Sequence, residues 1–64
     1  MRVNGDWVRL DREQTLLSYL QSQNLNIDTI AVELNGDIIL KETYAKTRLN
    51  DEDVLEIVHF VGGG

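Results

Sequence analysis

Hydrophobic and polar residues alternate in short runs along most of the chain, and one segment instead shows helical spacing. The opening, MRVNGDWVRL, has two extended runs around Asn4-Gly5, a dipeptide that suits the positive φ angles of a tight hairpin turn. Period-two alternation places Val8 and Leu10 on one face and Trp7 on the other. We therefore predict an N-terminal hairpin in which Trp7 is exposed and packs across the strands.

The segment DREQTLLSYLQSQN has the apolar spacing of a helix. Asp11 can cap its start, with Gln14 in the capping-box position three residues later. Asn24 suits the left-handed position just past its end. The apolar face consists of Leu16, Leu17 and Leu20. We predict an amphipathic helix of about three turns that packs these leucines in the core.

A second hairpin is predicted in TIAVELNGDIIL, around Asn35-Gly36. Ile30, Val32 and Leu34 share one face of its first strand, and Ala31 and Glu33 share the other. The connection KETYAKTRLNDED is rich in turn residues and is predicted to hold one helical turn near its tyrosine. The final apolar run, DVLEIVHF, predicts a strand.

This order of elements predicts an α+β fold. Two hairpins flank one helix, and the last strand must join the same sheet, so a mixed sheet of about five strands against one main helix buries every apolar face. That is the ubiquitin-like β-grasp arrangement. We expect residues 1–60 to form this domain and residues 61–64 to form a flexible glycine tail.

Composition narrows the chemistry. Sixty-four residues suffice for one domain. Because the chain has no cysteine and one histidine, a structural zinc site is unexpected. The net charge of −5, with six scattered basic residues, argues against nucleic-acid binding and suits a basic protein partner. No stretch approaches the length of a membrane span or a signal core, so we expect a cytoplasmic protein.

The middle of the chain, VELNGD, and its end, DEDVLEIVHFVGGG, together resemble the ThiS family of thiamine-biosynthesis sulfur carriers. The resemblance covers the whole chain, from its length and element order to the diglycine that falls on Gly63 and Gly64. Gly62 is an additional glycine before that diglycine, and it lengthens the tail without changing its chemistry.

The resemblance implies that the carboxylate of Gly64 is the functional group and that the protein is a co-substrate without catalytic residues. A ThiF-type enzyme would use ATP to adenylate it, and a sulfur donor protein would then displace AMP and leave a thiocarboxylate. A ThiG-type thiazole synthase would accept the sulfur. No cofactor is expected to be bound. Glycine offers the thinnest backbone, and residues 61–64 can reach about 13–14 Å into a partner's channel.

The last strand is predicted to carry a docking surface. Alternation places Leu55 and Ile57 on the face opposite Glu56, Val58 and Phe60, and an exposed apolar pair beside a functional tail suggests protein docking.

An acidic corner precedes this strand at Asp51, Glu52 and Asp53. We expect it to be solvated, to lie with Glu56 near the exit of the tail, and to contribute to docking of a basic partner rather than to metal binding. His59 has no paired nucleophile or carboxylate and is expected to be a strand residue without a catalytic role.

Two alternatives share the fold and the terminal chemistry. One is the small subunit of molybdopterin synthase, whose chains tend to be longer. The other is a ubiquitin-like modifier that becomes attached to lysines of target proteins. An enzyme is disfavoured because no nucleophile–base constellation occurs.

Overall fold

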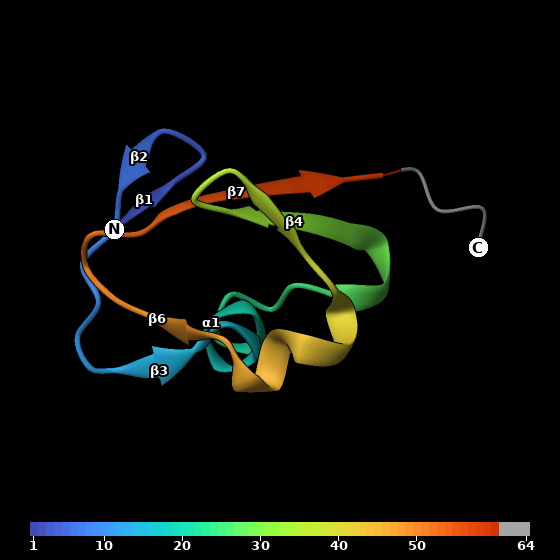
Figure 1. Ribbon diagram of the computed structural model, residues 1–64, viewed down its shortest axis with the longest axis horizontal. Helices are drawn as coiled ribbons and strands as arrows, with labels where there is room; N and C mark the ends of the chain where they lie inside the picture. Colours follow the sequence, from blue (N-terminus) through green and yellow to red (C-terminus); the bar gives the residue numbers. More distant parts are fainter. Residues whose placement is uncertain (61–64) are drawn as a thin grey trace.

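The computed structural model describes residues 1–60, which form a five-stranded mixed sheet with the helices on one side of it (Figure 1). The predicted tail, residues 61–64, lies outside the described residues. In chain order the elements are β1 (Arg2–Val3), β2 (Asp6–Trp7), β3 (Gln14–Thr15), α1 (Leu16–Ser22), the 3-10 helix η1 (Ile27–Thr29), β4 (Ile30–Leu34), β5 (Asp37–Ile39), the 3-10 helix η2 (Lys41–Lys46), β6 (Arg48–Leu49) and β7 (Val54–His59). The predicted α+β, β-grasp fold is confirmed.

Both predicted hairpins form at their Asn-Gly dipeptides. Asn4 and Gly5 have φ values of 51° and 87°, and Asn35 and Gly36 have φ values of 52° and 89°. Two successive positive φ angles are the requirement of a type I′ turn, whose twist matches that of the flanking strands. The first turn joins β1 to β2 and the second joins β4 to β5.

The last strand lies at the centre of the sheet, whose strand order is β2-β1-β7-β4-β5. β7 is parallel to β1 and antiparallel to β4. Beyond the short β1, the side chain of Asn4 continues the pairing: its Oδ1 accepts a hydrogen bond from Ile57 N at 2.7 Å, and its Nδ2 donates to Ile57 O at 3.1 Å. Both hairpins are therefore joined through β7.

The helix begins later than predicted, so the cap at Asp11 and its capping box with Gln14 are wrong. α1 starts at Leu16, and the Oγ1 of Thr15 caps it by accepting a hydrogen bond from Ser18 N at 3.1 Å. Gln14 instead belongs to β3, which pairs with β6 in a second, two-stranded sheet. With seven residues, α1 has about two turns rather than three.

The end of the helix and the interior follow the prediction more closely. Asn24 adopts the left-handed conformation, with φ of 58°. The core lies between the sheet and the helices, and it consists of Met1, Leu16, Tyr19, Leu20, Ile30, Val32, Tyr44, Leu49, Leu55 and Ile57. Leu17 packs at its edge. Burial raises the pKa values of the Tyr19 and Tyr44 phenols.

Trp7 packs across the N-terminal hairpin as predicted. It lies opposite Arg2 in the register of β1 and β2, and the Arg2 guanidinium carbon is 4.8 Å from the centroid of its ring. Trp7 is nevertheless 74% exposed. Within residues 1–60, no helix is long and apolar enough to cross a membrane.

Candidate functional site

The outer face of the sheet is the side opposite the helices (Figure 1). Because successive side chains of a strand point to opposite faces, the strand residues that are not directed into the core are directed outward here. We call this surface the outer face, and its residues are Arg2, Trp7, Ala31, Glu33, Ile38, Val54, Glu56 and Val58. All eight are exposed, and five of them are apolar.

The predicted docking residues of β7 lie where the alternation places them. Leu55 and Ile57 are buried, whereas Glu56 is exposed and Val58 is 59% exposed. Phe60 directly follows the strand and is 48% exposed. The structure therefore places an apolar pair at the last described residues before the glycines, and their role in docking stays a prediction.

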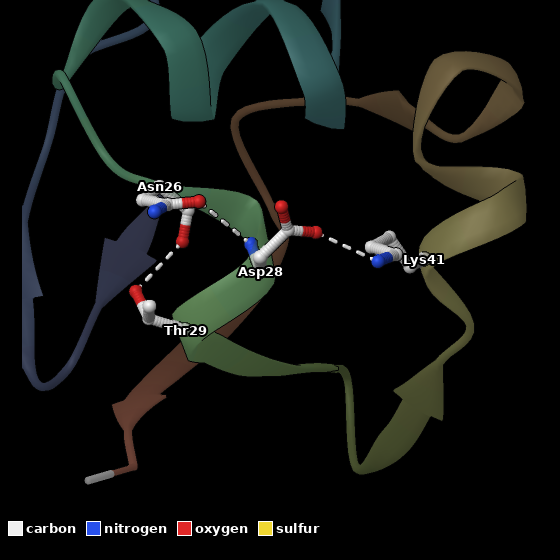
Figure 2. Close-up of polar contacts among 4 residues, drawn as sticks. All are labelled: Asn26, Asp28, Thr29 and Lys41. Atoms are coloured by element: carbon white, nitrogen blue, oxygen red, sulfur yellow. Dashed lines mark hydrogen bonds and ion pairs between the residues drawn. The ribbon is translucent and has the colours of Figure 1, made fainter. Parts of the chain in front are cut away.

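The exit toward the tail is held by the turn before β4. The backbone N–H of Phe60 donates to the carbonyl oxygen of Thr29 at 3.1 Å, which continues the pairing of β7 with β4 by one residue. Asn26 caps η1 through its Oδ1, which accepts from Asp28 N at 3.0 Å, and its carbonyl accepts from the Thr29 hydroxyl at 2.9 Å (Figure 2). These contacts fix the position of Thr29 and thereby of Phe60.

A charged contact ties the same turn to η2. The Nζ of Lys41 lies 2.7 Å from Oδ1 of Asp28, as Figure 2 shows. The hydrogen bond and the negative charge of Asp28 raise the pKa of Lys41. Both side chains are more than half exposed, so the pair orients the turn and contributes little to stability.

The prediction of a solvated acidic corner is wrong for Asp53. Its side chain is 7% exposed, and its Oδ1 accepts from Asn35 Nδ2 at 2.9 Å. Its Oδ2 accepts from Asn50 N at 2.8 Å. The carboxylate therefore joins the β4–β5 hairpin to the turn before β7, and it is not free to meet a partner.

The predicted position of the acidic corner is also wrong. Asp51, Glu52 and Asp53 precede β7, whereas Phe60 follows it, so the length of the strand separates them from the exit. At a rise of about 3.3 Å per residue, that separation is about 20 Å. Asp51 and Glu52 are exposed beside a shallow hollow whose other walls are Arg2, Trp7, Asp53 and Val54.

His59 and the carboxylates are the side chains of residues 1–60 that the sequence raised as candidates for acid–base chemistry or metal binding. His59 is exposed at the end of β7, opposite Ile30 of β4. Within residues 1–60, no group of three or more His, Cys, Asp or Glu side chains is arranged to hold a metal ion. Gly62, Gly63 and Gly64, which were predicted to carry the chemistry, lie outside the described residues.

Sequence reasoning missed one feature of the outer face. Glu33 of β4 lies directly opposite Glu56 of β7. The alternation in VELNGD directs Glu33 away from the core, but alternation does not reveal the register between two strands that are distant in sequence.

The whole chain is similar to proteins of one family. The family model described as the ThiS family matches residues 1–64. The sulfur carrier protein ThiS of Bacillus subtilis (strain 168) is 43% identical, over 100% of this chain and 98% of the relative. The crystal structure of the thiamine biosynthesis protein ThiS from Geobacter metallireducens superposes with a TM-score of 0.84 at 29% identity, covering 98% of this chain and 96% of that one.

A domain similar to this chain also occurs within a longer protein. A thiazole synthase of Paramagnetospirillum magneticum is 37% identical over 97% of this chain, and the match spans 19% of that protein.

Proposed function

Because the chain belongs to the ThiS family, we propose that it is a sulfur carrier of thiamine biosynthesis whose reacting group is the carboxylate of Gly64. The observation that carries this proposal is the 43% identity to the Bacillus subtilis sulfur carrier over the full length of this chain. The protein acts as a co-substrate in this scheme, and the catalytic groups belong to its partners.

The terminal chemistry takes two steps. A carboxylate is a poor acyl donor, so a ThiF-type partner joins a carboxylate oxygen of Gly64 to the α-phosphorus of ATP and releases pyrophosphate. A sulfur donor protein then delivers sulfur as hydrosulfide, which attacks the acyl carbon, displaces AMP and loses its proton to leave the thiocarboxylate. One oxygen of the terminus is thereby replaced by sulfur. The thiocarboxylate delivers this sulfur to a thiazole synthase for thiazole formation.

The outer face supplies the affinity in this proposal. Ordering a free backbone costs about 1–2 kcal/mol per residue, so a short glycine segment has little binding energy of its own. Val58 and Phe60 present exposed apolar surface next to the segment that must enter the partner, and Glu56 lies beside them on the same strand. Asp51 and Glu52 lie farther along and favour approach of a basic partner. We leave Asp53 out of this surface because its carboxylate is buried.

The proposal is tested by intact-mass measurement after incubation with a ThiF-type enzyme, ATP and a sulfur source. The expected product is heavier than the starting chain by the difference between one sulfur and one oxygen, and the added mass maps to Gly64. Two matched controls keep the folded residues unchanged: deletion of both Gly63 and Gly64, which removes the diglycine end, and extension of the chain by one residue after Gly64. Both should abolish AMP formation, and normal activation of the extended chain would contradict the proposal.

The same samples separate the alternatives. Sulfur accepted by a molybdopterin synthase large subunit, instead of by a thiazole synthase, would identify the other carrier class. Isopeptide-linked conjugates to lysines in cell extracts would identify a protein modifier.

A further inference from the structure

Two carboxylates with the same charge face each other at the centre of the outer face. Glu33 of β4 and Glu56 of β7 are directly opposite in an antiparallel pair. Two residues along the same ladder, Asn35 N donates to Val54 O at 2.8 Å, so the alternation of the ladder makes the two glutamates a hydrogen-bonded pair as well. In such a pair the Cα atoms lie about 5.5 Å apart, and both side chains project from the same face.

This arrangement is unfavourable for the isolated fold. Like charges directly opposite each other destabilise a sheet. Substitution of either glutamate by glutamine would remove the repulsion. Among residues 1–60 the ion pairs are Lys41 with Asp28 and Arg48 with Glu13, and neither of these pairs includes Glu33 or Glu56. The basic residue of the outer face, Arg2, is instead stacked on Trp7.

Exposed apolar side chains surround the two carboxylates. Ile38 is opposite Glu33 on the β5 side and is 75% exposed. Val58 follows Glu56 on β7, opposite the small side chain of Ala31, and is 59% exposed. Two carboxylates among exposed apolar side chains fit a partner surface that is largely apolar and carries one cation opposite them.

The charge also determines what can occupy this face. A second copy of the chain would bring four carboxylates together, and each copy carries a net charge of −5. A basic side chain of another protein removes the repulsion instead. A guanidinium suits the site because its planar group carries five N–H donors and can bridge two carboxylates at once.

We propose that Glu33 and Glu56 form a joint receptor for one arginine side chain of the activating enzyme, and that the fold tolerates their repulsion for that purpose. The inference rests on the proposed function, because it specifies the chemistry of the partner that docks on the outer face. It adds Glu33 to the predicted docking residues, and it places the main charged contact at the middle of β7 rather than at the acidic turn before it.

The test compares binding with stability in the same variants. The full-length protein carrying Glu33→Gln and Glu56→Gln is titrated against a ThiF-type enzyme, and its urea unfolding is measured in parallel. We expect binding to weaken at least about tenfold, with a shallower salt dependence, because the charge pair is lost. The unfolding midpoint should be equal to or higher than that of the unchanged protein.

A charge reversal sharpens the distinction. Glu33→Lys creates an attractive pair with Glu56 inside the chain, so the unfolding midpoint should rise while binding falls further than in the glutamine variant. The matched control removes two carboxylates that lie off the outer face, with Asp11→Asn and Glu42→Gln. It makes the same change in net charge and should leave the affinity within about threefold, since exposed charges away from the contact mainly alter the encounter rate.

Each remaining outcome contradicts the inference in a recognisable way. If Phe60→Ala weakens binding but the two glutamine substitutions do not, the carrier function and docking face stand and the arginine receptor is wrong. If the glutamine variant loses stability, the carboxylates have a structural role. If the free protein sediments as a dimer that tightens in the glutamine variant, the occupant is a second copy. If the unchanged protein is neither bound nor adenylated, the proposed function fails together with the inference.

Discussion

Asp53→Ala should strongly destabilise the protein, even though the residue belongs to an acidic turn. The carboxylate accepts hydrogen bonds from Asn35 Nδ2 at 2.9 Å and from Asn50 N at 2.8 Å, and the side chain is 7% exposed. Truncation removes both acceptor atoms at once. The substitution therefore separates the β4–β5 hairpin from the turn that leads into the central strand.

The magnitude follows from these two contacts. A hydrogen bond to a charged group contributes about 1.5–3 kcal/mol, and water that reaches the freed Asn50 N–H offsets part of that loss. We expect the free energy of unfolding to fall by about 2–4 kcal/mol. A domain of 64 residues has a total of roughly 3–10 kcal/mol at the usual value per residue, so the loss is a large fraction of the whole.

Urea unfolding followed by circular dichroism measures this change, and thermal melting checks it. Each kcal/mol corresponds to about 4–8 °C for a domain of this size, so the midpoint should fall by roughly 10–30 °C. Asp51→Ala is the matched control, because Asp51 is an exposed aspartate in the same turn. It should change the stability by less than about 0.5 kcal/mol.

The opposite pattern would refute this reasoning. If Asp53→Ala unfolded like Asp51→Ala but weakened binding to the activating enzyme, the carboxylate would be a docking group, as the sequence alone had indicated. The hydrogen bonds to the hairpin would then contribute nothing measurable to folding.

Three further predictions concern the exit, the tail and the core. Phe60→Ala should weaken association with the activating enzyme by about 1–3 kcal/mol with little loss of stability; a stability loss of about 3–5 kcal/mol in urea unfolding would instead mark a core residue. A chain ending at Val61 should compete with the full chain for that enzyme and bind within about tenfold, or 1.4 kcal/mol, whereas loss of nearly all binding would place recognition in the glycines. Burial raises the pKa values of Tyr19 and Tyr44 above 10.0, so the unfolded chain releases these protons at a lower pH than the folded one. The free energy of unfolding should therefore fall as the pH rises through 10, as measured by urea unfolding alongside phenolate absorbance. A free energy of unfolding that does not change over this pH range would contradict this.

The elements that were predictable from the sequence are those decided by near neighbours. Each Asn-Gly dipeptide selects its own turn, because two adjacent residues must both take positive φ. The faces of β7 follow from alternation alone, which places Leu55 and Ile57 inside and Val58 outside.

The start of the helix depended on a distant partner. Residues 11–14 resemble a capping box, but Gln14 pairs with Leu49 of β6, and this pairing leaves Thr15 at the start of α1. The local capping signal was therefore overridden by pairing with a residue that is 35 positions later in the sequence.

The same limit applies to the polar side chains of the turns. Asn4 and Asn35 are recognisable as turn residues, yet their amide groups also bind β7 through Ile57 and Val54. Asp53 is satisfied by Asn35, which lies 18 residues earlier in the chain. No spacing rule within a short window reports such contacts, so the acidic turn looked solvated.

The central position of β7 has a consequence for synthesis of the protein. Within the described residues, β7 lies between the two hairpins in the sheet and begins at Val54, so a growing chain cannot join the hairpins into one sheet until the residues of β7 have been made. Pairing Arg2 with Val54 also closes a loop of more than fifty residues, the kind of contact that slows folding. Assembly of the sheet during synthesis should therefore wait until β7 has left the ribosome. A chain that stops short of β7 has no outer face to present, so an activating enzyme that reads this face would not engage carriers that lack their reactive end.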